Sequence, residues 1–208
     1  MKTLKATDVG KRYNRDWIFR HVEATFEVGH SYAILGPNGS GKSTLLKALS
    51  GYLTLTEGTI TYLDEQDQPI PADRWFTHLS YVGPYIDLLE EFTVRELIDF
   101  HFRFQPLQDG LSAPQLIDRL HFQAHKDKLV RDLSSGMRQR LKLITALAAD
   151  TPILLLDEPA TNLDTEGVAW YHELVEEYGP GRLIIVASNR ADEYDWCEEQ
   201  MHVTKWKK

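Results

Sequence analysis

Apolar residues occur in short, uninterrupted runs at several places along the chain. Such runs are typical of strands that are buried on both faces of a parallel sheet. They predict buried strands at residues 152–156 and 182–188, and a further apolar stretch predicts a strand at residues 31–35. Looser alternation of apolar and polar residues, bounded by polar segments, predicts strands at residues 4–9 and 22–28. Further strands are expected at residues 58–63 and 78–82.

The middle of the chain has a different pattern, in which apolar residues recur at helical spacing. This spacing predicts helices at residues 94–104, 113–121 and 135–149. Two further helices, at residues 42–49 and 165–178, are expected to end near Gly51 and Gly179. Strands that alternate with helices predict a parallel α/β core with its ligand site at the carboxyl ends of the strands, and the middle block is expected to be a helical insertion.

The composition fits one globular domain that remains inside the cell. Of 208 residues, 42% are hydrophobic, which is enough for a full core in a single domain at 1–208. No apolar run approaches the roughly 20 residues of a membrane helix, and the segment from Met1 to Val9 lacks the long apolar stretch of a secretion signal. A formal net charge of −8 gives no general attraction for nucleic acid, so no nucleic-acid partner is expected. Cys197 has no second cysteine to pair with, and we expect it to be a buried apolar side chain.

A glycine-rich segment follows the strand at 31–35 and matches the phosphate-loop pattern Gly-x-x-x-x-Gly-Lys-Ser/Thr. Its residues are Gly36, Pro37, Asn38, Gly39, Ser40, Gly41, Lys42, Ser43 and Thr44. The glycines allow successive N–H groups to curl around an anion, and the following helix directs the positive end of its dipole into the loop. We therefore expect Lys42 to reach the β and γ phosphates of a nucleotide and Ser43 to ligate Mg²⁺. A glycine-rich turn that binds nothing is the alternative.

Two adjacent carboxylates, Asp157 and Glu158, follow the apolar run that ends at Leu156. They are expected at the tip of a buried strand, where Mg²⁺ needs oxygen ligands. Asp157 would hold the ion through water, and Glu158 would polarise the water that attacks the γ phosphate. An exposed turn at the end of the strand is the alternative for this pair.

A third segment, Leu133 to Met137, precedes the helix at 135–149, with Ser134 or Ser135 as its N-cap. With the phosphate loop upstream and Asp157-Glu158 downstream, the arrangement resembles the ATP-binding cassette (ABC) ATPases. Their signature at this place is Leu-Ser-Gly-Gly-Gln. Residues 159–164 likewise resemble that family's D-loop.

The resemblance covers essentially the whole chain and implies an α/β fold. The expected fold is a P-loop NTPase core with a mainly parallel sheet, an N-terminal antiparallel β subdomain and an inserted α-helical subdomain. Residues 1–83 and 151–208 would form the nucleotide-binding core, and residues 84–150 the helical subdomain that carries the signature. Tyr13 stands where the family stacks an aromatic residue on adenine. Trp17 is the second choice for this role, and a packed surface aromatic is the alternative for both residues.

The resemblance also implies ATP and Mg²⁺ as cofactors and a second ABC subunit as partner. In the family two cassettes pair head to tail, as homodimers or heterodimers, and each ATP lies between one subunit's phosphate loop and the other's signature. Ser134, Ser135 and Gly136 would therefore act on the nucleotide held by the partner. ATP would hold the dimer together, and hydrolysis would release it.

The chain departs from the family at positions that matter for hydrolysis. Pro84 stands where the family has a glutamine that orients water and Mg²⁺, and proline has no side-chain donor or acceptor. Asn189 stands where the family has its switch histidine; it can donate one neutral hydrogen bond but cannot become cationic. Ser135 and Met137 replace the signature's first glycine and last glutamine. One hypothesis is that ATP binding and dimerisation are intact while hydrolysis is slow or needs a partner. The other is that proline and asparagine serve equally well in this subfamily.

Three functions are compatible with these residues. The first is an ATP-hydrolysing subunit that powers a transporter and is held at the inner face of the cell membrane by a separate transmembrane subunit. The second is a soluble cassette ATPase of the cluster-assembly type, and the third is an ATP-sensing regulatory subunit with little turnover. An aromatic-rich group favours the first, because part of it would form a groove for a transporter's cytoplasmic helix. Its residues are Tyr81, Tyr85, Phe92, Phe100, Phe102 and Phe104. The alternative for much of the group is a place in the core, since Phe100 and Phe104 are expected to share a helix face.

Overall fold

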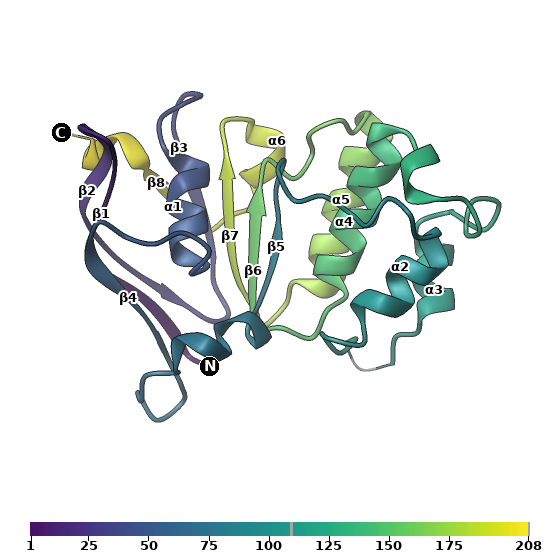
Figure 1. Ribbon diagram of the computed structural model, residues 1–208, viewed down its shortest axis with the longest axis horizontal. Coiled ribbons are helices and arrows are strands. Elements are labelled where there is room, and N and C mark those ends of the chain that lie inside the picture. Colours follow the sequence, from purple (N-terminus) through teal and green to yellow (C-terminus); the bar gives the residue numbers. More distant parts are fainter. Residues whose placement is uncertain (109, 208) are drawn as a thin grey trace. The chain divides into compact units, whose positions relative to one another are not determined.

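The computed structural model describes residues 1–108 and 110–207 (Figure 1). The strands are β1 (Thr3–Tyr13), β2 (Asp16–Glu27), β3 (Ser31–Leu35), β4 (Glu57–Leu63), β5 (Leu79–Val82), β6 (Ile153–Asp157), β7 (Leu183–Ser188) and β8 (Glu199–His202). The helices are α1 (Lys42–Leu49), α2 (Val94–His101), α3 (Ala113–Arg119), α4 (Ser135–Leu147), α5 (Thr165–Tyr178) and α6 (Ala191–Tyr194), with short 3-10 helices at Ala72–Thr77, Val130–Asp132 and Val203–Trp206.

The first of two compact units comprises residues 1–81, 152–158 and 181–207 and contains two sheets. One is antiparallel, in the order β2-β1-β4, as expected for the N-terminal part of the chain. The other has the order β5-β6-β7-β3-β8, and β6, β7, β3 and β8 run parallel. Every residue of β3, β6 and β7 is buried, as their unbroken apolar sequences predict.

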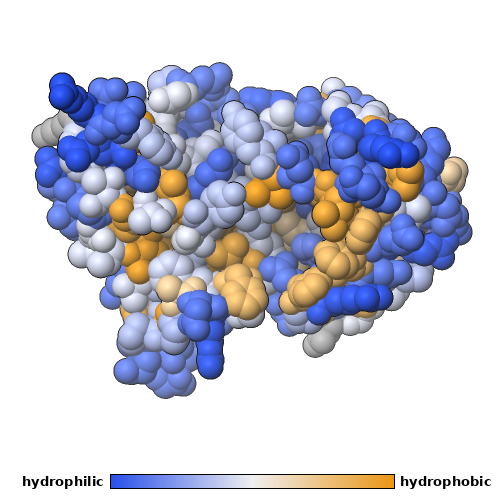
Figure 2. All heavy atoms as spheres, in the orientation of Figure 1, coloured by the Kyte–Doolittle hydropathy of each residue, from blue (hydrophilic) through white to orange (hydrophobic). Residues whose placement is uncertain are grey.

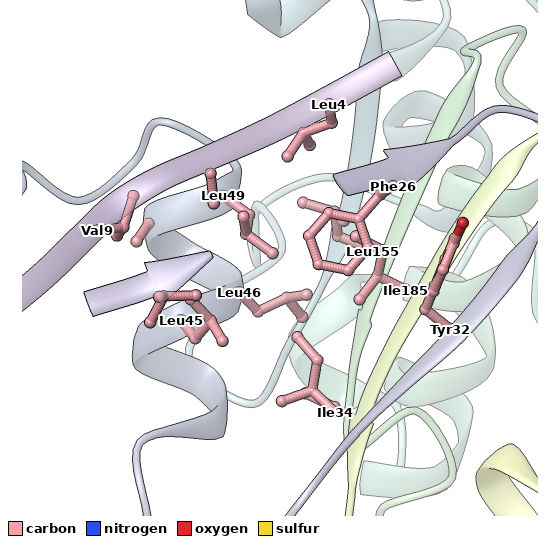
Figure 3. Packing of buried hydrophobic residues seen from close by; sticks show 14 of the residues in the cluster. Leu4, Val9, Phe26, Tyr32, Ile34, Leu45, Leu46, Leu49, Leu155 and Ile185 are labelled. Atoms are coloured by element: carbon pink, nitrogen blue, oxygen red, sulfur yellow. The ribbon is translucent and has the colours of Figure 1, made fainter. Parts of the chain in front are cut away.

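Helix α1 contributes the leucines that join the two sheets into one core. Leu45, Leu46 and Leu49 are fully buried. Figure 3 shows them next to Leu4 and Val9 of the antiparallel sheet and to residues of the parallel sheet. Since α1 begins at the last residues of the phosphate loop, this packing fixes the position of the loop relative to the sheet.

The second compact unit comprises residues 82–151 and 159–180 and carries helices α2 to α5. Residues 159–180 belong to it, whereas the sequence predicts them with the nucleotide-binding core. The reason is packing within the unit: the Trp170 Nε1 of α5 donates to Arg119 O at the end of α3 (3.0 Å), and the Arg140 guanidinium of α4 lies 5.4 Å from the Trp170 ring centroid.

The predicted elements are all present, with differences at their ends. Helix α2 ends at His101 rather than Phe104, because the following residues form turns in which Phe104 N donates to His101 O (3.1 Å). Helices α3 and α4 likewise end two residues early. Strand β8 and helix α6 were not predicted, since β8 is a short, polar strand at the sheet edge with no apolar pattern. Within the described residues, no helix is both long and apolar enough to cross a bilayer.

Cys197 is buried, as predicted, and burial raises the pKa of its thiol to about 12. A thiol in this state is a poor nucleophile, so the side chain serves packing.

Candidate functional site

The loop between β3 and α1 brings together the predicted phosphate-loop residues, from Gly36 to Gly41, with Lys42, Ser43 and Thr44 in the first turn of α1. Gly39 and Gly41 have φ values of 72° and 105°, in the left-handed region that favours glycine. A Cβ at Gly41 would also lie 2.6 Å from the Ile18 Cγ2. Both backbone conformation and space therefore require glycine at position 41.

The Lys42 side chain lies inside the loop and reaches the carbonyls at its start. Its ammonium donates to Gly36 O (2.8 Å) and Pro37 O (3.3 Å), and the residue is 5% exposed. The Ser40 Oγ is also buried and has no hydrogen-bond partner among the described residues. An anion in the loop would offer Lys42 a stronger acceptor than two neutral carbonyls and would give Ser40 the partner that a buried hydroxyl requires.

The first turn of α1 adds a second attraction for an anion. Its N-cap is Gly41, which supplies no side-chain hydrogen bond, and the turn contains no acidic residue. The N–H groups at this end are thus not satisfied by a side chain, and the positive end of the helix dipole lies at the loop. This is the arrangement that binds phosphate in many proteins.

Asp157 lies at the end of β6 and is fully buried. The Ser43 Oγ donates to its Oδ1 (2.8 Å), and the Tyr81 hydroxyl donates to its Oδ2 (3.2 Å). Burial raises the pKa of the Asp157 carboxyl, and the two hydrogen bonds oppose that shift. A hydroxyl and a carboxylate held this closely fit the oxygen ligands that Mg²⁺ prefers, with phosphate oxygens and water completing its shell.

Glu158 is half-buried and has an unusual backbone conformation. Its φ is 48°, in the left-handed region, which costs a residue with a side chain about 1–2 kcal/mol. Its N–H donates to Ala187 O of β7 (2.9 Å), so the sheet holds the strained residue in place. Backbone strain of this kind clusters at functional sites, where it directs a side chain that the strand alone would aim elsewhere.

Asn189 follows β7 and contacts the phosphate loop directly. Its Nδ2 donates to the Asn38 Oδ1 (2.9 Å). The turn that carries it is fixed by the Ser188 Oγ, which donates to the fully buried carboxylate of Glu193 and accepts from the Arg190 N–H (2.9 Å). The neutral amide of Asn189 thus lies beside the phosphate loop.

Tyr13 lies at the end of β1 and is 48% exposed, with the Lys11 ammonium 4.9 Å from its ring centroid. Trp17 is less exposed and has the guanidinium groups of Arg12 and Arg20 within 5.3 Å and 4.5 Å of its ring centroid. Of the two aromatic residues, Tyr13 offers the more accessible face for a base.

The predicted signature residues line a cavity of about 480 Å³ within the second unit. Ser134 is the N-cap of α4, and its Oγ accepts from Met137 N (3.2 Å), which decides between the two candidate caps. The cap uses only the acceptor side of the hydroxyl, so its proton remains available to a ligand. The cavity is lined by Leu120, His121, Phe122, His125, Ser134, Ser135, Gly136, Met137, Arg140, Asn162, Leu163 and Asp164.

The signature helix is tied to residues 159–164 by contacts that sequence reasoning missed. A Cβ at Gly136 would lie 3.0 Å from Asn162 O, so glycine permits a close approach of the two segments. The Gln139 Nε2 donates to Pro159 O (2.6 Å), and Arg140 pairs with Asp164 (3.8 Å). Gln139 and Arg140 lie on α4 at helical spacing from Ser135 and Gly136, but nothing in the sequence identifies their partners.

Most of the predicted aromatic group lies at the surface of α2 and the adjoining segments, where Figure 2 shows apolar surface. The ring of Phe100 makes edge contacts with those of Phe92 and Phe104, at centroid distances of 5.2 and 5.1 Å. We call these three residues the α2 patch. Phe104 is 69% exposed. Tyr81 does not belong to this patch, since its hydroxyl is bonded to Asp157 in the first unit. Pro84 is exposed.

Comparisons with known proteins agree with this geometry. Residues 19–161 match the family described as ABC transporter. The chain is similar to AlbC of Bacillus subtilis, which is named as an ABC transporter ATP-binding protein (31% identity over 92% of this chain and 83% of AlbC). It is also similar to the Nod factor export ATP-binding protein I of Sinorhizobium fredii (34% identity over 92% of this chain and 57% of that protein).

A solved structure shows the same fold at lower identity. The bacterial ABC transporter cassette MJ0796, solved as a dimer, has a TM-score of 0.80 and 21% identity, over 96% of this chain and 94% of that one. MJ0796 has also been solved as a dimer in a post-hydrolysis state bound to ADP and Pi, with a TM-score of 0.82.

The left-handed backbone of Glu158 predicts that glycine at this position gives a more stable protein than alanine, the reverse of the order in a helix. Replacing Glu158 by Gly or Ala removes the carboxylate in both cases, but only glycine relieves the left-handed conformation. We expect the free energy of unfolding of Glu158→Gly to exceed that of Glu158→Ala by about 1 kcal/mol in urea denaturation without nucleotide. The matched pair at exposed Glu176 in α5 should show the opposite order, because alanine favours a helix by about 1 kcal/mol. A Glu158→Gly protein less stable than Glu158→Ala would contradict the prediction.

Proposed function

Since the chain belongs to the ABC transporter family, we propose that it binds and hydrolyses ATP as the energising subunit of a membrane transporter. The observation that carries this proposal is the joining of Lys42, Ser43 and Asp157 at one end of the parallel sheet. ATP hydrolysis needs a group that binds phosphate, ligands for magnesium and a base for the attacking water. The chain offers Lys42 for the first, Ser43 and Asp157 for the second, and Glu158 for the third.

Each residue of this site has a part in that chemistry. The loop N–H groups and Lys42 would bind the β and γ phosphates, and Tyr13 would stack on the adenine. Ser43 and Asp157 would hold Mg²⁺, which neutralises phosphate charge when it is bound. Glu158 would accept a proton from the attacking water, and Asn189 would donate to the γ phosphate.

The signature cavity would receive the nucleotide of a second ABC subunit, paired head to tail. Ser134, Ser135 and Gly136 would present a hydroxyl and helix N–H groups to the partner's γ phosphate. The contacts of Gln139 and Arg140 with residues 159–164 support this role, because they fix two of the segments that line the cavity relative to each other. ATP would then join the two subunits, and hydrolysis would separate them.

A separate transmembrane subunit would hold the protein at the inner face of the cell membrane. The α2 patch supports this part of the proposal, since an exposed aromatic cluster is a common protein-docking surface. A soluble cassette of the cluster-assembly type would have no such membrane partner.

Head-to-tail pairing of two copies predicts that two inactive variants restore activity when they are mixed. Lys42→Ala removes the phosphate contact of its own subunit, and Ser134→Arg blocks the site that it offers to its partner. Each variant alone should hydrolyse no ATP. Their mixed dimers contain one intact composite site, so an equimolar mixture should recover about a quarter of the wild-type turnover.

The readout is steady-state phosphate release. A mixture of Lys42→Ala with Lys42→Ala,Ser134→Arg is the control that contains no intact site. Absence of recovery from two folded variants, with an active wild type, would contradict a dimer of two copies of this chain.

The neutral switch residue predicts slow hydrolysis. In single-turnover measurements Asn189→Ala should lower the rate by about 10², because one donor to the γ phosphate is lost. Asn189→His should raise the rate above wild type, since a cationic donor is restored. Affinity for a fluorescent ATP analogue serves as the control and should be unchanged. A fast wild-type rate that Asn189→Ala leaves unaltered would contradict the prediction, and ATP-dependent dimers without phosphate release would instead favour an ATP sensor.

The α2 patch predicts that the protein binds a membrane protein and that one substitution in the patch abolishes this binding. A tagged chain should co-purify with a multi-span protein from detergent-solubilised membranes, and Phe104→Asp should abolish this association without affecting ATP binding. Phe76→Asp is the matched control, because Phe76 is 65% exposed but lies in the first unit. Co-purification of no membrane protein by the wild type would favour the soluble alternative.

A further inference from the structure

The carboxylate of Asp157 is held at both oxygens by hydroxyl groups from different elements. Ser43 of α1 donates to Oδ1 and Tyr81 of β5 donates to Oδ2. Because Asp157 is fully buried, a carboxylate oxygen without a donor would be costly there. Ser43 is a proposed ligand of the cation, whereas the proposed function assigns no role to Tyr81.

We infer that Tyr81 is a positioning residue for the divalent-cation site. Its O–H fixes the rotation of the Asp157 carboxylate and keeps Oδ1 beside Ser43, the other residue that would hold the cation. The inference rests on the proposed function, and it extends the site to a residue that the sequence assigns to the aromatic group.

The chemistry of the phenol suits this task. A phenol hydroxyl is protonated at neutral pH, and at 3.2 Å from the Asp157 Oδ2 it acts as the donor. A fixed donor behind a metal-binding carboxylate orients the ligand and tunes its basicity, and loss of such a contact typically weakens metal binding 10- to 100-fold.

A purely structural role is the competing explanation, and the packing of Tyr81 allows the two to be separated. The ring packs against the hydrophobic core of the first unit, and Tyr81→Phe keeps that ring while removing only the hydroxyl. Tyr62 provides the matched control. Its buried hydroxyl donates to Leu49 O (2.8 Å), so Tyr62→Phe also removes one buried phenolic hydrogen bond in the same unit, but away from Asp157.

The test measures metal dependence separately from nucleotide binding. In a Glu158→Gln background, which prevents turnover, the affinity for a fluorescent ATP analogue is measured in EDTA and during titration with Mg²⁺. We expect Tyr81→Phe to bind the analogue normally in EDTA and to need about tenfold more Mg²⁺ for half of the metal-dependent gain in affinity. Tyr62→Phe should match the parent protein in both conditions. The same shift should appear when Mn²⁺ binding is followed by electron paramagnetic resonance.

The possible results separate the inference from the proposed function. Equal Mg²⁺ dependence of Tyr81→Phe and the parent would overturn the inference alone. An equal loss in EDTA and in Mg²⁺, or the same metal shift in Tyr62→Phe, would also overturn it, because a general structural effect would be responsible. If the parent protein binds no nucleotide in either condition, the proposed function itself fails.

Discussion

Burial of three parallel strands is the constraint on which the candidate site depends. Strands β3, β6 and β7 are apolar throughout, and water is excluded from both of their faces. Their register aligns their ends, since Leu35 is paired with Ser188 and Asp157 with Ala187. The phosphate loop, the carboxylate pair and Asn189 therefore follow the strands at the same end of the sheet, although they are far apart in the sequence.

At that end of the sheet, a buried charge and a strained backbone, each unfavourable by itself, are stabilised by hydrogen bonds from neighbouring residues. Asp157 is a buried carboxylate that needs the hydroxyls of Ser43 and Tyr81. Glu158 has a left-handed backbone that the hydrogen bond to Ala187 maintains. Burial of the apolar strands offsets these costs.

The helical unit prepares its own half of a site in a different way. The N-terminus of α4 is capped by Ser134, and Gly136 allows the helix to approach residues 159–164 closely. Buried Gln139 then links the helix to the backbone of that segment. The cavity is thus shaped by contacts within one unit, while the proposed nucleotide for it comes from a second subunit.

The sequence alone determined most of the elements. Residues 31–35 and 165–178 form the predicted strand and helix without adjustment, because unbroken apolar runs and helical spacing with a glycine stop are local signals. The glycine-rich loop lies between β3 and α1 as predicted, because its glycines meet local requirements for space and conformation.

Only the tertiary structure decided which side chains meet. In the tertiary structure Tyr81 is hydrogen-bonded to Asp157 and does not belong to the α2 patch. Asn189 is hydrogen-bonded to Asn38, and Glu158 has a strained backbone conformation. The tertiary structure also assigned residues 159–180 to the helical unit. These outcomes depend on strand order, register and packing between segments distant in the chain, and no local pattern of hydrophobicity or spacing encodes such pairings.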